Sequence, residues 1–202
     1  MVYTMGPHAE LFKIDVTDRW HGVCVKVPDG LAHDIASFTH MGGIAMSSLR
    51  ASDIELGDLV AVSGMGAIGN LAAQFAQLQG AKVIGIDIVD SRLKIATESG
   101  IGQVVNSSAQ DLEAALEAFT GGSRVSAWID ATGVSAVIID AIGRIAANGE
   151  LILLGSPRAR FETDLTPFLQ KIHLLDGIKV KGALEFLWPT HRDDFNKHSI
   201  ER

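Results

Sequence analysis

The sequence predicts an α/β fold built on a doubly wound parallel sheet of six strands. Between residues 59 and 182, six short apolar segments alternate with segments of helical periodicity, an arrangement typical of βαβ units. The apolar segments are continuous rather than alternating, as expected for strands whose two faces are both covered by helices. A glycine-rich turn directly after the first strand is the third observation that favours this fold.

The apolar runs place the strands at residues 59–63, 82–87, 103–106, 127–130, 150–154 and 178–182. The connecting segments predict helices at residues 67–79, 91–99, 108–119, 135–146 and 166–175. Gly80 is expected to end the first of these helices, and Ser91 to cap the start of the second. The glycines at 121 and 122 are expected to end the third.

The chain before the sheet has a different character. Residues 1–28 are expected to form short strands and turns, with strands over 9–16 and 23–27. These strands lack partners of their own in the sequence, so we expect them to belong to a sheet that lies mostly outside this chain. Residues 32–50 are expected to be helical.

Composition and charge narrow the class of protein. The chain has 202 residues, of which 47% are hydrophobic and 20% charged, as in ordinary globular proteins. The net charge of −7 argues against a nucleic-acid partner. No apolar run approaches the ~18 residues of a spanning helix, and residues 1–10 lack the pattern of a secretory signal. With Cys24 as its single cysteine, the chain is expected to be cytoplasmic.

The strongest chemical signal is a G-x-G-x-x-G motif between a strand and a helix, formed by Gly64, Met65, Gly66, Ala67, Ile68 and Gly69. The first glycine of such a motif permits a sharp turn, the second lets backbone approach a pyrophosphate, and the third permits close packing of the helix. The pyrophosphate then lies at the helix N-terminus, where free N–H groups favour negative charge. The motif in this context predicts a Rossmann dinucleotide-binding domain.

An acidic residue suggests which dinucleotide binds. Asp87 ends the next strand, at the usual distance of about 20 residues from the motif, where a carboxylate accepts hydrogen bonds from the adenosine ribose and repels a 2′-phosphate. The residues that follow directly are Ile88, Val89 and Asp90, and none of the three is basic. This favours NAD(H), although Arg92 nearby leaves NADP(H) open. A methyltransferase could use a similar loop and acid, but six strands fit a dinucleotide-binding sheet better.

Two further turns leave the carboxyl ends of strands, where ligands of such sheets bind. Thr132 and Gly133 follow the fourth strand, and Gly155 and Ser156 follow the fifth. We include all four in the expected cofactor site.

Taken together, these features resemble the medium-chain dehydrogenase/reductase family, whose members include zinc-type alcohol dehydrogenases. The matching segments are residues 57–69, 80–87, 92–93, 129–133, 149–155 and 181–183. The resemblance implies hydride transfer between NAD(H) and an alcohol or carbonyl, with Gly155, Ser156 and Ala183 beside the nicotinamide. It also implies a homodimer formed through residues 178–182. Residues 1–31 resemble the last part of the family's catalytic (GroES-like) domain, and residues 32–202 its NAD(P)-binding domain.

The family's usual zinc ligands from its glycine–histidine–glutamate element and its cysteine would precede Met1, so zinc is expected only in the intact protein. The third ligand falls near Thr39 and His40, but His40 is expected to pack against a helix or face solvent. Cys24 is expected to be buried in an apolar strand. We therefore assign no catalytic residue and no metal ligand. The alternative function is a non-catalytic module that binds a nucleotide or assembles with partners.

Overall fold

The computed structural model describes residues 1–4, 6–7, 9–18 and 22–184, and it divides the chain into two compact units. One unit includes the described residues up to Ile44, and the other is formed by Ala45–Leu184. The larger unit contains all six strands of a parallel sheet and the helices that cover it.

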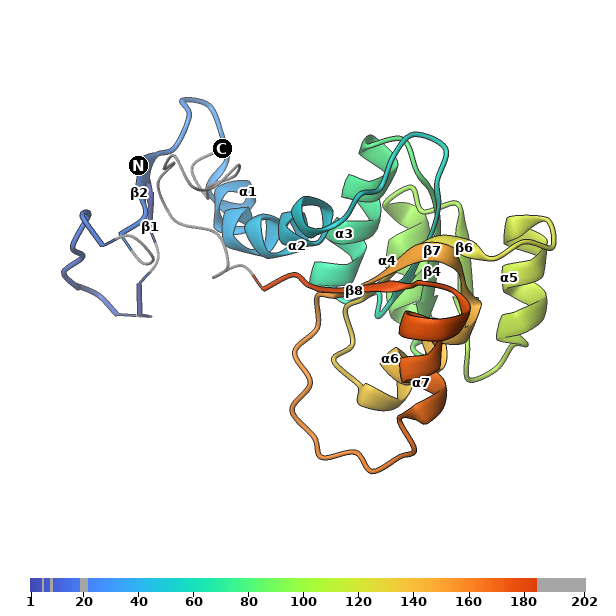
Figure 1. The fold of residues 1–202 in the computed structure, drawn as a ribbon. Coiled ribbons are helices and arrows are strands. Elements are labelled where there is room, and N and C mark those ends of the chain that lie inside the picture. The colour runs from blue at the N-terminus through green and yellow to red at the C-terminus, as the bar shows by residue number, and fades with distance from the viewer. Residues whose placement is uncertain (5, 8, 19–21, 185–202) are drawn as a thin grey trace. The chain divides into compact units, whose positions relative to one another are not determined.

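The sheet has the order β5-β4-β3-β6-β7-β8, and every neighbouring pair of strands is parallel (Figure 1). Its strands are β3 (Leu59–Ser63), β4 (Lys82–Asp87), β5 (Gln103–Asn106), β6 (Val125–Asp130), β7 (Ile145–Leu153) and β8 (Lys179–Gly182). The helices are α3 (Ala67–Leu78), α4 (Asp90–Glu98), α5 (Leu112–Thr120), α6 (Ser135–Ala141) and α7 (Thr166–Gln170). The turn η1 (Ile142–Arg144) continues α6, and η2 (Lys171–Leu175) continues α7. The predicted fold class is confirmed.

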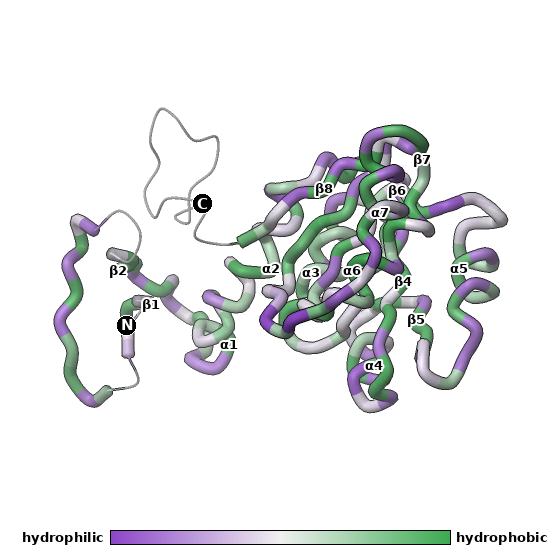
Figure 2. The backbone as a smooth tube through the Cα atoms, turned by 60° about the horizontal axis from the view of Figure 1, so that its bottom comes forward, coloured by the Kyte–Doolittle hydropathy of each residue, from purple (hydrophilic) through white to green (hydrophobic). Residues whose placement is uncertain are grey.

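Helices cover both faces of this sheet because the chain winds outward from β3 in both directions. Right-handed crossovers then place α3 and α4 on one face and α5, α6 and α7 on the other, as the sides of the sheet in Figure 1 show for α3 and α6. On the second face, Trp128, Leu151 and Ile178 form a buried cluster with apolar side chains of α5 and α6. Figure 2 shows the hydrophobic colour along the strands and hydrophilic segments on α4 and α5.

Local hydrogen bonds determine where the helices end. After α3, the N–H of Gly80 donates to the carbonyl of Gln77 and that of Ala81 to the carbonyl of Ala76. This is the Schellman arrangement, and it requires the left-handed φ of +102° that Gly80 adopts. The prediction that Gly80 ends this helix therefore has a structural basis.

The starts of two helices differ from the prediction. The N-cap of α4 is Val89 rather than Ser91, which lies inside the helix. Helix α5 begins only at Leu112, because the Asp111 carboxylate accepts the N–H groups of Glu113 and Ala114 as a cap. The preceding residues form a turn in which the Asn106 side chain accepts from Ser108.

The predicted helix over residues 135–146 is too long, because β7 begins at Ile145. The Ile145 side chain is completely buried beside β6, so tertiary packing overrides its helical spacing. The strand is irregular at Asn148, which adopts a φ of +63° and donates its N–H to the carbonyl of Asp176. Gly149 follows, where an added Cβ would lie 2.5 Å from the carbonyl oxygen of Ser126.

In the smaller unit, β1 (Val2–Thr4) pairs with β2 (Cys24–Lys26) in an antiparallel ribbon, and α1 (His33–Ser37) follows. The predicted strand over 9–16 is wrong, since its described residues form no strand and the Asp15 carboxylate instead accepts from Thr17 in a turn. The expectation that the early strands have no partner in this chain is also wrong.

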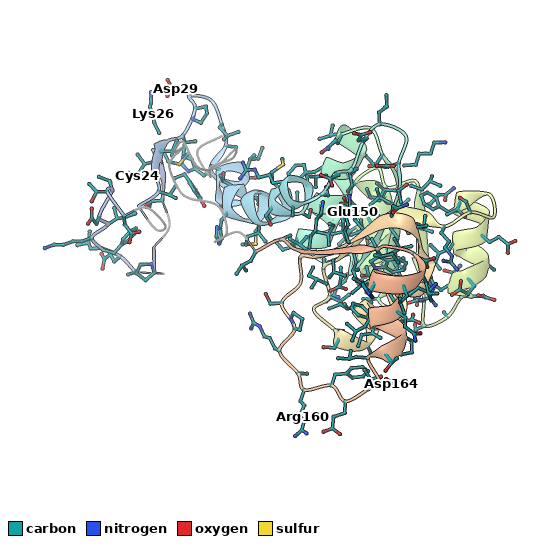
Figure 3. All side chains as sticks on the ribbon, viewed as in Figure 1. Cys24, Lys26, Asp29, Glu150, Arg160 and Asp164 are labelled. Atoms are coloured by element: carbon teal, nitrogen blue, oxygen red, sulfur yellow. The ribbon has the colours of Figure 1, made fainter. Side chains whose placement is uncertain are left out.

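Cys24 is exposed, contrary to the prediction of a buried position (Figure 3). A ribbon of two strands has too little surface to cover both of its faces, and the neighbouring Lys26 pairs with Asp29 at 3.4 Å on the exposed side. Helix α2 (Thr39–Ala51) completes the helical region predicted over 32–50. Among the residues with described positions, no helix has the length and apolarity needed to cross a membrane.

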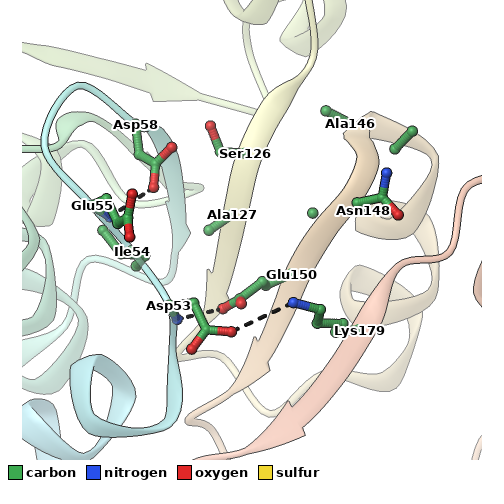
Figure 4. A pocket seen from close by; sticks show the side chains of 12 residues that line it. Asp53, Ile54, Glu55, Asp58, Ser126, Ala127, Ala146, Asn148, Glu150 and Lys179 are labelled. Carbon is green, nitrogen blue, oxygen red and sulfur yellow. Dashed lines mark hydrogen bonds and ion pairs between the residues drawn. The ribbon is translucent and has the colours of Figure 1, made fainter.

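An ion network lies at the amino edge of the sheet (Figure 4). The Lys181 ammonium lies 2.8 Å from the Asp53 carboxylate and 2.9 Å from the buried carboxylate of Glu150. Figure 4 shows two further interactions of Asp53, whose N–H donates to Glu150 at 3.0 Å and whose carboxylate lies 3.5 Å from the Lys179 ammonium. Hydrogen bonds from Lys181 lower the pKa of Asp53 to about 2. Burial opposes the charged form of Lys181, but its bonds to the two acids leave its pKa raised. A cavity of about 330 Å³ lies beside the network, between Asp58 and Asn148.

This network predicts an acid-dependent part of the stability. The pKa of Asp53 is 3.8 ordinarily and about 2 in the fold, so its ionised form stabilises the fold above pH 3.8. That contribution is lost as the pH falls from about 4 to 2. Because the Asp53 side chain is 68% exposed, we expect screening to limit the contribution to about 1 kcal/mol or less. Asp53→Asn should therefore lower the free energy of unfolding at pH 7 by at most that amount.

Urea titrations of both proteins at pH 7, 4 and 2 measure this difference, which should be much smaller at pH 2 than at pH 7. Asp29→Asn is the matched control, because its pair with Lys26 is almost fully exposed and should add no measurable stability. A difference for Asp53→Asn that persists unchanged at pH 2 would contradict the assignment.

Candidate functional site

The candidate site lies at the carboxyl edge of the sheet, around the point where the chain reverses direction between β3 and β6. In a doubly wound sheet this reversal opens a crevice, because the connections from the two strands leave toward opposite faces. The loop after β3 and the turns after β4, β6 and β7 all reach this edge.

The three glycines of the loop after β3 differ in their backbone conformation and in the space around them. Gly64 adopts a φ of +90°, which turns the chain sharply at the end of the strand. Gly69 lies in α3 so close to the loop that an added Cβ would be 1.7 Å from the Gly64 carbonyl oxygen. At Gly66, an added Cβ would meet no atom within 4 Å. The first and third glycines are therefore required by the fold, whereas Gly66 borders open space.

Helix α3 presents an uncapped N-terminus at this open space. Its N-cap is Gly66, so no side chain accepts the N–H groups of the first turn, which contains the exposed Ala67 and half-buried Ile68. Unpaired N–H groups and the helix dipole together favour an anion there. The arrangement is suited to bind a phosphate or pyrophosphate.

Asp87, at the end of β4, holds the glycine loop in place. Its carboxylate accepts the N–H of Met65 at 2.7 Å on one oxygen, and those of Ile88 and Val89 on the other. The Asp87 side chain is only 3% exposed, and the half-exposed Arg92 guanidinium lies 3.6 Å from it. The acid and the loop, which the sequence placed together by spacing alone, are thus in direct contact.

Met65 and Ile88 have opposite surroundings. The Met65 side chain is buried, and a Cβ added at Gly85 would lie 2.5 Å from its sulfur, so Met65 packs on the bare backbone of β4. Ile88 is 65% exposed. Of the two, Ile88 is the side chain that could contact a ligand.

The turns after β6 and β7 touch each other. A Cβ added at Gly133 would lie 2.7 Å from the carbonyl oxygen of Ser156, and one at Gly155 would lie 2.3 Å from the Gly133 nitrogen. Thr132 meets the glycine loop, since its methyl group would be 3.0 Å from a Cβ at Gly64. The four predicted residues of these turns therefore form one surface with that loop.

Ala183 lies just beyond β8 and is almost completely buried. Its N–H donates to the carbonyl of Leu153 at 3.0 Å, and its own carbonyl accepts the Ser47 hydroxyl. These two hydrogen bonds hold the end of β8 beside the end of β7, which is the strand that Gly155 follows in the sequence.

Sequence reasoning missed Asp130, the last residue of β6. It is completely buried, and its carboxylate accepts hydrogen bonds from Ser63, Thr132 and Gly133. The available signal was an acidic residue at the end of an otherwise apolar strand, although its donors could not be named from the sequence.

The residues considered as metal ligands do not assemble. Within the described ranges, no group of three histidine, cysteine or acidic side chains could hold a metal ion. His40 is half-buried in α2, and Cys24 is exposed in the ribbon. The described part of the chain therefore does not fit a zinc site.

Comparison with known proteins identifies the family. A family model described as zinc-binding dehydrogenase matches residues 67–197, more than half of the chain. The chain belongs to the zinc-binding dehydrogenase family. The matched region starts at the first residue of α3 and includes Asp87, Asp130 and the turns after β6 and β7.

Solved structures agree with this assignment. The chain is 25% identical to 2R,3R-butanediol dehydrogenase from Bacillus subtilis (TM-score 0.70; 81% of this chain, 46% of that one). It is 25% identical to benzyl alcohol dehydrogenase from Acinetobacter calcoaceticus (0.69; 81% and 45%). It is 26% identical to a zinc-binding dehydrogenase from Sinorhizobium meliloti 1021 bound to NADP (0.70; 80% and 47%). The chain thus spans about half the length of these structures.

The different surroundings of the loop glycines predict different effects of an added methyl group. Gly69→Ala forces a backbone clash between α3 and the loop, so we expect it to lower the free energy of unfolding by about 2 kcal/mol or more. Gly66→Ala meets open space at a φ of −67° and should change it by no more than about 0.5 kcal/mol. Urea unfolding of both variants measures the contrast, and equal effects would refute it.

Proposed function

We propose that this chain forms the NAD(H)-binding part of an alcohol or polyol dehydrogenase that works in the cytoplasm. In this proposal residues 1–31 belong to the catalytic domain and residues 32–202 to the cofactor-binding domain. The bound nicotinamide supplies the position that accepts or donates a hydride. The observation that carries the proposal is the carboxylate of Asp87, held against a glycine loop whose middle glycine borders open space.

The pyrophosphate of the cofactor would bind at the start of α3. The N–H groups of Ala67, Ile68 and Gly69 belong to the first turn, which has no side-chain cap. Gly66 leaves room for the phosphates to approach the backbone, because no side chain intervenes there. Backbone donors in this position stabilise the double negative charge without a lysine or arginine.

The adenosine would bind beside Asp87. A carboxylate has about four acceptor positions, and the N–H groups of Met65, Ile88 and Val89 occupy three. One position on the oxygen that faces Arg92 is left for a ribose hydroxyl. A 2′-phosphate would bring its charge against this carboxylate, which supports NAD(H) over NADP(H). Ile88 offers an exposed apolar surface to the adenine ring.

The nicotinamide would lie across the turns after β6 and β7. Thr132, Gly133, Gly155 and Ser156 form a continuous backbone surface, and Ala183 lies at the end of the next strand. Backbone groups exposed there could hold the ring's carboxamide and so present one face of the ring to the substrate.

The substrate class rests on the relatives. The names of two of them specify a butanediol and benzyl alcohol, which supports an alcohol or the corresponding carbonyl compound as substrate. One relative is bound to NADP, so the choice of cofactor has to be tested on Asp87 and Arg92 directly. Zinc is assigned only to the intact protein, because the described residues do not fit a site for it.

Calorimetric titration with NADH and NADPH tests the cofactor assignment. The chain should bind NADH at least about ten-fold more tightly than NADPH. Asp87→Ala should abolish that preference, since a hydrogen bond to a charged group contributes about 1.5–3 kcal/mol. Asp87→Asn is the second variant: it removes the charge and keeps one acceptor oxygen, so it too should lose the preference for NADH, with weaker binding of both cofactors because its NH₂ group faces a backbone N–H.

Two further variants separate the alternatives. Arg92→Ala should keep the preference for NADH, whereas a preference for NADPH that is lost in Arg92→Ala would reverse the assignment. Gly66→Ala should weaken NADH binding although its stability is unchanged. If the unaltered chain binds neither cofactor, the proposed function fails.

We further propose that two copies of the chain associate through β8. This strand pairs with β7 alone among the described strands, so its other edge has free hydrogen-bonding groups. The segment leading to it exposes Leu169, Leu174 and Leu175, each by more than half. An edge strand flanked by exposed leucines is suited to a symmetric contact with a second copy.

Analytical ultracentrifugation tests this association. Leu174→Glu places a charge in the proposed contact and should shift the protein from dimer to monomer, with no loss of stability, because Leu174 is 69% exposed. Leu56→Glu is the matched control at an 86% exposed leucine before β3 and should remain dimeric. A monomer before any substitution would disprove the proposal.

A further inference from the structure

We propose that Asp130 is a positioning residue for the nicotinamide half of the cofactor site; this inference rests on the proposed dinucleotide-binding function. Asp130 does not face the cofactor itself. It acts through the turn of Thr132 and Gly133, which its carboxylate holds against the turn after β7.

Four donors converge on this one carboxylate. One oxygen accepts the Ser63 hydroxyl at 2.8 Å, the Thr132 hydroxyl at 2.6 Å and the Thr132 N–H at 3.3 Å. The other accepts the Gly133 N–H at 3.0 Å. Asp130 has 0% exposure, and in the described part of the chain its partners are neutral groups. Burial of a carboxylate is costly unless hydrogen bonds satisfy it, and here both of its oxygens are engaged.

The backbone carbonyl of Asp130 connects the end of β6 to the end of a third strand, β7. The N–H groups of Leu154 and Gly155 both donate to the Asp130 carbonyl, at 2.9 and 2.7 Å. The Ser63 hydroxyl, which donates to the Asp130 carboxylate, in turn accepts the Trp128 indole N–H at 3.0 Å. Asp130 therefore links the ends of β3, β6 and β7, and the turns after β6 and β7 form the proposed nicotinamide surface.

This site requires a carboxylate and not merely a polar side chain. An asparagine of the same shape has one acceptor oxygen, and its NH₂ group would face either the Gly133 N–H or the two hydroxyls. In the first orientation two donors oppose each other, and the turn at Gly133 loses its anchor. The turn has little freedom to adjust, because Gly133 has a φ of +64° and packs on the Ser156 carbonyl.

The two buried acids at this edge hold separate parts of the site. Asp87 fixes the N–H of Met65 in the glycine loop, which would bind the adenosine half and the pyrophosphate. Asp130 fixes Thr132 and Gly133. A defect at Asp130 should consequently affect ligands that include the nicotinamide and spare those that do not.

The test compares NADH with AMP, which has the adenosine and one phosphate but no nicotinamide. In titrations of the full chain, Asp130→Asn should weaken NADH binding by about ten-fold or more and change AMP binding by less than about two-fold. The nicotinamide fluorescence of bound NADH should also move toward that of free NADH. A general loss of structure could not produce this difference between the two ligands.

Gly133→Ala is a second variant that keeps the proposal testable if Asp130→Asn does not fold. The added methyl group would lie 2.7 Å from the Ser156 carbonyl oxygen, so it disturbs the same turn without placing a new polar group in the core. The same selective loss of NADH binding is expected. Asp58→Asn is the matched control, an acid at the amino edge of the sheet, and should bind both ligands normally.

The outcomes separate the two proposals. If the altered chains lose NADH and AMP binding equally, or lose neither, Asp130 does not position the nicotinamide half, and the proposed function still stands. If the unaltered chain binds neither ligand, the proposed function fails, and the role of Asp130 fails with it.

Discussion

The close approach of α3 to the loop after β3 is the constraint on which the rest of the site depends. Gly69 lies so near the Gly64 carbonyl that no side chain fits between them. Because Gly69 and Gly64 lie so close, α3 begins directly at the loop, and its N-terminus points to the crevice next to β6. The same loop contains Gly66, which borders open space, and Met65, whose N–H donates to Asp87.

Buried carboxylates have different structural roles at the two edges of the sheet. At the carboxyl edge, Asp87 and Asp130 accept hydrogen bonds from backbone and hydroxyl groups and so fix loops. At the amino edge, Glu150 pairs with Lys181 and joins two neighbouring strands to the segment before β3. The loops held by these acids present backbone N–H groups at the start of α3, which suits a surface that receives an anionic cofactor.

Much of the fold and half of the site could be predicted because their signals are local. The strands at 59–63, 82–87 and 103–106 have the predicted bounds, since each is a short apolar run between turn residues. The glycine loop and Asp87 could be found because the motif and its acid have a fixed spacing. The errors lie where distant residues compete with local preference, as at Ile145, whose burial extends β7 into a predicted helix.

The sequence by itself determined the order of the elements, the glycine loop and the acid expected to choose the cofactor. These depend on backbone conformation and on short spacings. Only the tertiary structure decided the role of Asp130, whose hydroxyl donor Ser63 comes from a strand 67 residues earlier in the chain. It also decided that Cys24 is exposed and that the two early strands pair with each other. Hydrogen bonds between residues so far apart depend on strand order and register, which no local pattern specifies.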